Sequence, residues 1–323
     1  MPAQIIDGEA IAAKIIDSLK QQIEDLKADG KEPHLTAVQV GENPASKIYV
    51  RNQKRSCEEV GIKYTLDEQP EDTDQSGLIG RIKELNCDPT VSGIILQMPL
   101  PKGVDARKVQ SIIGPLKDVE GMNPANMGRL VYGEAKPGPC TAVGAVELLK
   151  STGVEIEGAN AVVVGHSEIV GKPISLLLLG LNATVSTVHV FTKDLASYVK
   201  NADVLFVAAG KSQAMWMRYR RESKKKHETP LPDLSALIPA EMIKPGAVVI
   251  DVAINRIPKG FDSDGKPLLN KKGKTAMQTV GDVDFEAAKE VAGHITPVPG
   301  GAGPMTVAML LKNTVDTASS QRT

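Results

Sequence analysis

Cysteine is scarce in this chain, with three residues among 323, at Cys57, Cys87 and Cys140. The count is odd, the three lie far apart in the sequence, and no two of them form a CxxC pair. This pattern argues against a disulfide framework and against a zinc site, and it favours a reducing compartment. We therefore predict no metal site.

The chain also lacks an excess of charge of either sign. It carries 38 Lys and Arg against 39 Asp and Glu, which gives a formal net charge of -1. A nearly neutral protein has no global field to attract nucleic acid or an anionic membrane. Any partner must therefore be recognised by local chemistry.

Long hydrophobic runs are absent as well. The longest apolar stretch, residues 174–181, is far too short to span a bilayer. The first residues have neither the basic flank and apolar core of a signal peptide nor the Arg-rich pattern of a transit peptide. We expect a soluble cytoplasmic protein without a membrane partner.

Helix and strand patterns alternate through the first half of the chain. Residues 9–28 carry apolar side chains at helical spacing, and a short apolar run over 35–40 ends at Gly41. The alternation continues with helices at about 45–60 and 76–85 and strands near 62–66 and 91–98. Because these strands are apolar on both faces, the pattern predicts a parallel sheet covered by helices.

A second series of strands follows a Gly/Pro-rich stretch at residues 121–139. These strands are expected at 161–165, 183–190, 203–208 and 247–252. We predict an α/β protein with a domain boundary near residue 145. A closing helix over about 304–318 has apolar positions that suit packing on either domain.

One segment, at about 213–236, breaks the α/β pattern and is predicted to be an inserted loop. Residues 215–234 contain six basic side chains against three acidic ones: Arg218, Arg220, Arg221, Lys224, Lys225 and Lys226 against Glu222, Glu228 and Asp233. Such a run is typical of nucleic-acid binding or of a solvated surface loop. We favour the solvated loop, with Trp216, the only tryptophan, anchoring its base.

Residues 161–181 have the order of a dinucleotide-binding turn. A buried strand ends at Gly165, a short turn follows, and Gly171 opens an apolar helix. The spacing is not GxGxxG, so an ordinary strand-to-helix turn is the alternative. No acidic residue follows at the position that binds a ribose hydroxyl in NAD-specific folds, and residues 189–193 contain nothing to repel a 2′-phosphate. NADP is therefore favoured, with NAD as the alternative.

Residues 296–306 contain three prolines and three glycines, which rules out a regular helix or strand over most of this stretch. Glycine allows the backbone to approach a flat ligand, and proline reduces the entropy lost on binding. The segment is either a ligand-holding loop or a rigid turn between elements. It leads into a helix N-terminus, which favours anions.

Taken together, these motifs resemble one family over nearly the whole chain, the bifunctional methylenetetrahydrofolate dehydrogenase/methenyltetrahydrofolate cyclohydrolases. The matching pieces are VGENPAS at 40–46 with Tyr49, GIILQMPLP at 93–101, KDVEG at 117–121, PCT at 139–141, GHSEIVGKP at 165–173, VGDV at 280–283 and the loop at 296–306. The resemblance implies a homodimer of two-domain subunits with a folate substrate.

The resemblance also implies a fold. Two α/β domains flank a cleft: residues 1–145, completed by 304–323, form the folate domain. Residues 146–303 form a Rossmann-type nucleotide domain that carries the insertion. The closing helix thus packs back on the N-terminal domain.

The resemblance assigns roles to individual residues. Tyr49 would stack on the folate, Gln97 would lie beside the reacting one-carbon unit, and Glu120 would hold the pterin ring. Pro299, Gly300 and Gly303 would line the folate side of the cleft. The implied cofactor contacts are Thr141, Gly165, His166, Ser167, Gly171, Pro173, Ile254 and Thr306.

One departure from the family bears directly on chemistry. The family's catalytic lysine lies four residues after the tyrosine, and here that position is Gln53. Lys54 is about 100° away around a helix and is a poor substitute. Since an amide cannot take or release a proton at neutral pH, we predict a retained dehydrogenase and a weak or lost cyclohydrolase.

Smaller departures occur at Glu120, where most members have Asp, and at His166, where an Arg that grips the 2′-phosphate is frequent. The first moves a carboxylate by about 1.5 Å, and the second predicts a weaker and pH-dependent preference for NADP. Two alternatives stay open: a fully bifunctional enzyme, and a non-catalytic relative that keeps both binding sites.

Overall fold

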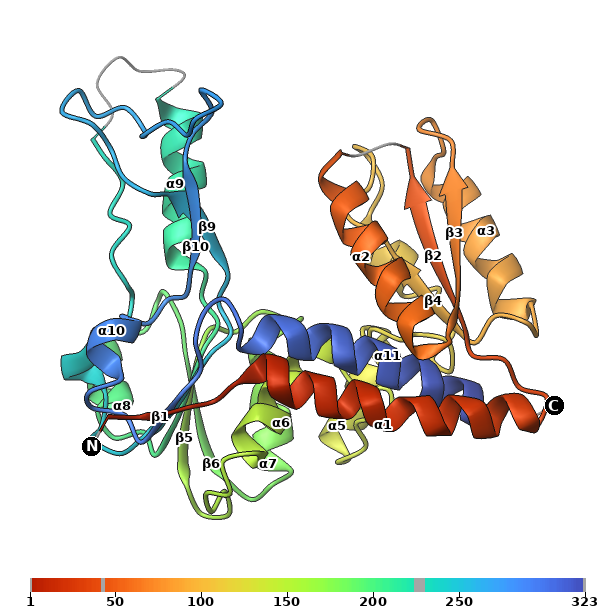
Figure 1. Ribbon diagram of the computed structural model, residues 1–323, viewed down its shortest axis with the longest axis horizontal. Helices are drawn as coiled ribbons and strands as arrows, with labels where there is room; N and C mark the ends of the chain where they lie inside the picture. Colours follow the sequence, from red (N-terminus) through yellow and green to blue (C-terminus); the bar gives the residue numbers. More distant parts are fainter. Residues whose placement is uncertain (1, 42–43, 224–229, 322–323) are drawn as a thin grey trace. The chain divides into compact units, whose positions relative to one another are not determined.

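The computed structural model describes residues 2–41, 44–223 and 230–321, and the chain forms two compact units (Figure 1). Residues 10–144 and 304–323 form one, here called the small-sheet unit, and residues 1–9 and 145–303 form the other, the large-sheet unit. Glu42 and Asn43 of the VGENPAS motif and the Lys224–Lys226 run lie outside the described residues.

The small-sheet unit is built on three parallel strands. β2 (His34–Val40) lies between β3 (Lys63–Gln69) and β4 (Gly93–Leu96). All residues of β2 and β4 are buried, as expected for a covered parallel sheet, whereas β3 is an edge strand with residues exposed on one face. The expectation of strands apolar on both faces is therefore wrong for β3.

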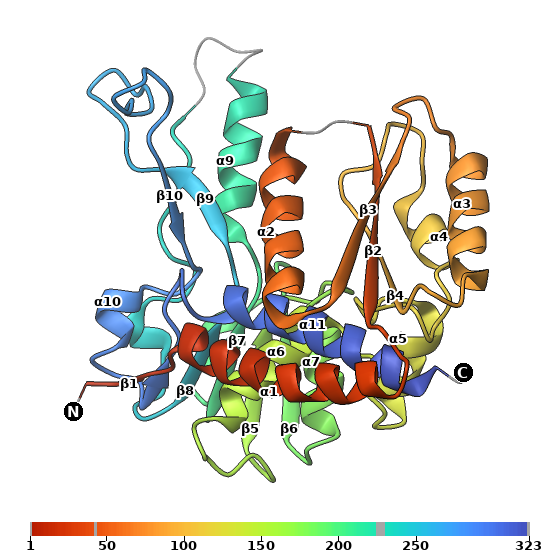
Figure 2. The ribbon, with the colours of Figure 1, turned by 45° about the vertical axis from the view of Figure 1, so that its right-hand side comes forward.

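Helices cover this small sheet. α3 (Gln75–Cys87) begins where the Asp74 carboxylate accepts a hydrogen bond from the Gly77 N–H, and it buries Leu78, Ile82 and Leu85. α2 (Pro44–Val60) joins β2 to β3. α1 (Gly8–Ala28) and α11 (Ala302–Ser320) run side by side in both views (Figures 1 and 2). α4 (Ala106–Gln110) and α5 (Pro124–Val131) complete the series, and α6 (Cys140–Lys150) spans the boundary between the two units, which falls after Gly144.

The closing helix packs within the small-sheet unit. The Asn313 side-chain amide of α11 donates hydrogen bonds to the carbonyls of Val119 and Gly138, at 2.8 and 2.9 Å. Met305 of the same helix lies against Gly144, where an added Cβ would come within 2.9 Å of the Met305 side chain. The last helix is therefore fixed by buried polar bonds as well as by apolar packing.

The large-sheet unit contains six parallel strands in the order β1-β11-β8-β7-β5-β6. Their bounds are β1 Gln4–Ile5, β5 Asn160–Val164, β6 Thr184–Val188, β7 Val204–Val207, β8 Val248–Asp251 and β11 His294–Ile295. The first strand of the series, β5, has its successor β6 on one side and β7 on the other. The strand order reverses there, and Rossmann-type sheets bind ligands at such a point.

Short helices connect these strands: α7 (Gly171–Leu179), α8 (Leu195–Val199), α10 (Phe285–Ala288) and a 3-10 turn at Ala240–Met242. The two-strand antiparallel pair β9 (Asn255–Pro258) and β10 (Met277–Val280) lies beside α9 (Lys211–Glu222) in both views (Figure 2). The α/β class with a Rossmann-type parallel sheet is confirmed. Among the described residues, no helix combines the length and apolar character needed to cross a membrane.

Two local expectations differ from the structure. Residues 1–9 belong with the large-sheet unit rather than the first domain, because β1 pairs with β11. The first half of the predicted inserted loop is helical through Glu222, since its apolar side chains, Trp216 above all, pack on one side of α9. Trp216 is buried as expected, against Tyr219 and Phe261.

Candidate active site and dinucleotide site

Two glutamines meet in the small-sheet unit. Gln53 lies on α2 and Gln97 directly follows β4, where its backbone N–H is held by the Val38 carbonyl. The Gln97 side-chain amide donates to Gln53 Oε1 at 3.0 Å, and both side chains are about 95 % buried. The structure therefore brings together two of the four residues predicted to be catalytic.

Tyr64 of β3 completes this glutamine cluster. Its hydroxyl donates to the same Gln53 Oε1 at 3.1 Å. Burial raises the pKa of Tyr64, so the phenol stays neutral at physiological pH. Gln53 Nε2 is buried and has no hydrogen-bond partner in the described part of the chain. Position 53 thus accepts two hydrogen bonds and holds one unused buried donor.

Tyr49 lies one helical turn before Gln53 on α2, and about half of its surface is exposed. Burial of its inner part raises the pKa of the Tyr49 phenol, and the Glu120 carboxylate raises it further. The ring is therefore neutral and presents an open aromatic face, which suits stacking on a flat ligand.

Glu120 is a titratable group of this cluster whose pKa lies near neutral pH. Burial, together with the charge of Asp118, raises the pKa of Glu120 to about 8. Gln110 Nε2 lies 3.4 Å from Glu120 Oε2. Asp118 itself is fully buried and accepts hydrogen bonds from the Asn123 backbone N–H and the Asn126 amide.

Cys140 lies beneath these carboxylates. It is buried, its thiol donates to the Val119 carbonyl at 3.2 Å, and burial raises its pKa well above the ordinary value. A thiol that stays protonated is a poor nucleophile. We therefore assign Cys140 a packing role in the site rather than a catalytic one.

Sequence reasoning missed Tyr64 and did not single out Asp118. Tyr64 is outside every matched motif and reaches Gln53 because β3 pairs with β2 in parallel register. Asp118 lies in the KDVEG motif, two residues before Glu120. Its position in a matched motif, close to a predicted site residue, could have indicated a role in the site.

The predicted dinucleotide turn has a tightly packed backbone. Gly165 follows β5 with φ of +120°, and a Cβ there would come within 2.5 Å of the Ala208 carbonyl oxygen. A Cβ on Gly171, the first residue of α7, would lie 2.0 Å from the Gly165 carbonyl oxygen. Only glycine fits at either position, which brings the start of the helix against the end of the strand as a Rossmann turn requires.

Polar side chains surround this turn. His166 and Ser167 are exposed, and the imidazoles of His166 and His189 lie 4.4 Å apart between ring centres. Ser167 Oγ accepts a hydrogen bond from the Val170 N–H. Pro173 is buried inside α7, and Ile254 is exposed just before β9.

The remaining predicted contacts fall in two places. The hydroxyls of Thr141 and Thr306 lie 3.2 Å apart in the small-sheet unit. Pro299, Gly300 and Gly303 lie in the large-sheet unit, where Gly300 has a φ of +106° that favours glycine. The structure describes these residues in a different unit from Tyr49, Gln97 and Glu120.

Two models of one family match the chain. Residues 6–120 match the catalytic domain of tetrahydrofolate dehydrogenase/cyclohydrolase, and residues 139–222 and 234–322 match the NAD(P)-binding domain of the same family. Residues 223–233 fall outside the match, within the segment predicted to be an insertion. The chain belongs to the tetrahydrofolate dehydrogenase/cyclohydrolase family.

Individual relatives agree over the full length. The bifunctional protein FolD of Moorella thermoacetica is 45% identical over 318 residues, covering 98% of this chain and 99% of the relative. The crystal structure of the bifunctional FolD enzyme of Campylobacter jejuni superposes with a TM-score of 0.83 at 39% identity, covering 98% and 99% of the two chains. The Trypanosoma brucei enzyme, complexed with NADP and an inhibitor, gives 0.81 at 33% identity, covering 99% and 98%.

Proposed function

We propose that this chain oxidises 5,10-methylenetetrahydrofolate to 5,10-methenyltetrahydrofolate with NADP, and that its cyclohydrolase activity is weak or lost. Family membership supports the dehydrogenase part. The observation that carries the second part is the placement of Gln53, whose carbonyl oxygen is occupied by the Tyr64 hydroxyl and the Gln97 amide.

The residues present fit a dinucleotide. The glycine-only contacts at Gly165 and Gly171 bring the N-terminus of α7 against the end of β5, and the positive end of the helix dipole there favours a pyrophosphate. His166 is exposed and the half-buried His189 lies beside it, and neither imidazole would repel a 2′-phosphate, which supports NADP. The NADP-bound Trypanosoma brucei relative supports the same cofactor.

Oxidation makes modest demands on the side chains. The nicotinamide, when bound, accepts the hydride. The chain must hold the folate ring, and Tyr49 and Glu120 are the residues proposed to do so, with an open aromatic face and a carboxyl group. Gln97 is buried and fixed at the end of β4, which suits a positioning role beside the one-carbon unit.

Hydrolysis of the methenyl product demands more. Water must be activated and protons must move, and the Gln53 amide cannot carry a proton at neutral pH. Acid/base help of this kind contributes about 10² to 10⁴ in rate, or about 3 to 5 kcal/mol of barrier. The buried Gln53 Nε2 donor is no substitute, because an amide N–H does not dissociate.

The test follows both reactions by absorbance on one purified sample. We expect reduction of NADP⁺ with methylenetetrahydrofolate and little hydrolysis of methenyltetrahydrofolate in the absence of nucleotide. Rapid hydrolysis would overturn the second half of the proposal alone. Absence of activity in both assays would favour the alternative that this chain is a non-catalytic relative of the family.

A fully bifunctional enzyme is the second candidate, and the raised pKa of Glu120 favours it. With a pKa of about 8, its carboxyl group exchanges a proton near neutral pH. If hydrolysis is observed, the rate in Glu120→Gln decides whether this carboxyl group supplies the proton. The homodimer implied by the family resemblance belongs to the same proposal, and light scattering tests it.

A further inference from the structure

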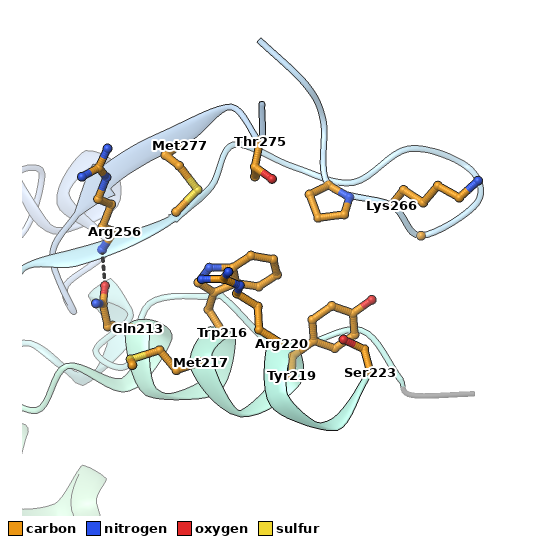
Figure 3. Close-up of a pocket in the computed structure, with 12 residues that line it drawn as sticks. Gln213, Trp216, Met217, Tyr219, Arg220, Ser223, Arg256, Lys266, Thr275 and Met277 are labelled. Atoms are coloured by element: carbon orange, nitrogen blue, oxygen red, sulfur yellow. Dashed lines mark hydrogen bonds between the residues drawn. The ribbon is translucent and has the colours of Figure 1, made fainter. Parts of the chain in front are cut away.

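A cavity lies in the large-sheet unit, beside a helix that neither proposed activity uses. It has a volume of about 630 Å³ and is bounded by α9 on one side and by β9, β10 and the chain between them on the other (Figure 3). Cavities of about 300–1,000 Å³ are typical of small-ligand sites. Here it is called the α9 groove.

Positive charge is distributed along the α9 groove. Arg220 comes from α9, Arg256 from β9 and Lys266 from the connecting loop, and no carboxylate is among the described residues that line the cavity (Figure 3). Within the described residues, Arg220 and Arg256 form no ion pair. Lys266 Nζ lies 3.7 Å from Asp264 in an exposed pair, which holds it only weakly. Three cations are thus free to bind an anion.

Flat surfaces line the same groove. The rings of Trp216 and Tyr219 stack with 5.7 Å between centres and 21° between planes. The Arg220 guanidinium lies over the indole, 5.8 Å from its centre. Aromatic rings and guanidinium planes are the groups on which nucleobases stack in proteins.

We propose that the α9 groove binds a small anion with a planar ring, of the nucleoside phosphate class, at a site separate from the β5–α7 dinucleotide turn. The ring packs beside Trp216, Tyr219 and Arg220, and the phosphates extend toward Arg256 or Lys266, which lie at opposite ends of the groove (Figure 3). A single nucleotide is favoured over a nucleic-acid strand. The cavity has the size of one small ligand, and a net charge of -1 supplies no field for a polyanion.

The backbone on both sides of the groove is well anchored. The Gln213 side chain accepts a hydrogen bond from the Arg256 N–H at 2.6 Å, and Asn255 Oδ1 accepts one from the Gln213 N–H at 2.8 Å. Phe261 packs edge-on against both Trp216 and Tyr219. The walls are therefore preformed, which lowers the entropy cost of binding.

The sole tryptophan makes the test direct. The full-length protein is titrated with ATP while Trp216 fluorescence is recorded, without NADP⁺, which is itself a nucleoside phosphate and could occupy the groove. Equilibrium dialysis with labelled ATP, compared between the parent and the groove variants, gives the stoichiometry of the groove. We expect a saturable change at one site per chain. Adenosine and inorganic tripolyphosphate, which carry only the ring or only the charge, should each bind at least about tenfold more weakly.

Variants distinguish binding in the α9 groove from a general effect of positive charge on the protein surface. Replacing both end cations, in the double variant Arg256→Gln and Lys266→Gln, should weaken ATP binding at least about fivefold, as the loss of a charge-assisted hydrogen bond predicts, and the two single variants show which end the phosphates reach. The matched control is Arg221→Gln, which removes one charge from the same helix outside the groove and should leave binding unchanged. Melting curves and far-UV circular dichroism confirm that each variant is folded.

Four results would overturn the proposal. They are no saturable response to ATP, equal binding of tripolyphosphate and ATP, tighter binding of a single-stranded oligonucleotide than of ATP, and a fluorescence change that follows protein concentration without ligand. The last two would assign the groove to nucleic acid or to a second copy of the chain. None of these measurements depends on whether the dehydrogenase proposal holds.

Discussion

Gln53 is the position at which a single side chain decides between two reactions. Replacing it with lysine puts an ionisable donor where Tyr64 and Gln97 now donate. The Tyr64 hydroxyl can accept instead, and Gln97 can present its carbonyl oxygen. We expect Gln53→Lys to raise the methenyltetrahydrofolate hydrolysis rate by about 10² to 10⁴ while the dehydrogenase changes little.

Two controls accompany this prediction. Gln53→Met keeps the approximate length without a proton carrier and should not hydrolyse. Lys54→Gln removes the neighbouring lysine, which is exposed and paired with Glu58, and should have no effect on either rate. Equal hydrolysis in the Gln53→Lys variant and the parent would show that position 53 does not limit the reaction.

The sequence could predict residues that lie in motifs, but not the contacts between them. Tyr49 and Gln53 share a helix face by spacing alone, and Gln97 follows an apolar strand. Tyr64 donates to Gln53 only because β3 lies beside β2 in a register that no local pattern specifies. The raised pKa of Glu120 likewise depends on burial beside Asp118, which is a tertiary property.

At the scale of elements, the junction of β5 and α7 depends on two glycines. A methyl group on Gly171 would collide with the Gly165 carbonyl, and backbone cannot move aside as a side chain can. We expect Gly171→Ala to lower the free energy of unfolding by about 1–3 kcal/mol and to weaken NADP binding. Urea unfolding and cofactor titration measure the two effects.

The matched control is Gly80→Ala on α3. No atom lies within 4 Å of the added Cβ there, and alanine favours a helix. This variant should be more stable by about 0.5–1 kcal/mol with unchanged NADP affinity. If both variants behaved alike, the close strand-to-helix approach would not be the cause.

The start of α9 depends on one distant carboxylate. Asp282 is fully buried and accepts hydrogen bonds from the backbone N–H groups of Ala209, Gly210 and Lys211. Asp282→Ala leaves these donors without a partner and should cost about 2–4 kcal/mol in unfolding free energy. Asp284→Ala, which removes only the exposed cap of the short α10, should cost under about 2 kcal/mol.

Helices and strands could be predicted where the hydrophobic periodicity of the sequence is strong. They could not be predicted where an element forms only because of its tertiary contacts. The helix at 9–28 and the strand at 35–40 agree with α1 and β2 within a residue. β1 has only two residues and exists through its pairing with β11, so no period could indicate it. α9 has a polar composition, and its helical form follows from the Trp216 cluster and the Asp282 cap.

At the scale of the whole molecule, each unit contains acids that are protonated more readily in the folded state, among them Asp118, Glu120 and Asp251. In the small-sheet unit, burial and Asp118 raise the pKa of Glu120 from 4.5 to about 8. In the large-sheet unit, burial, with a smaller effect of Asp282, raises the pKa of Asp251 from 3.8 to about 7. The folded chain therefore holds more protons than the unfolded chain between these values.

The contribution of these acids to stability should accordingly fall as the pH rises from about 4.5 to about 8 and level off above that, while His34, whose pKa burial lowers from 6.5, contributes in the opposite direction. A raised acid pKa means that folding favours the neutral carboxyl, and this contribution is lost as each group ionises in its native site. Glu120→Gln stays neutral at every pH, so the variant should match the parent at pH 5 and exceed its unfolding free energy at pH 8.5. Urea unfolding at several pH values measures both curves. Parallel curves for parent and variant would mean that Glu120 is already ionised in the folded protein, and would remove the proton source that a fully bifunctional enzyme would require.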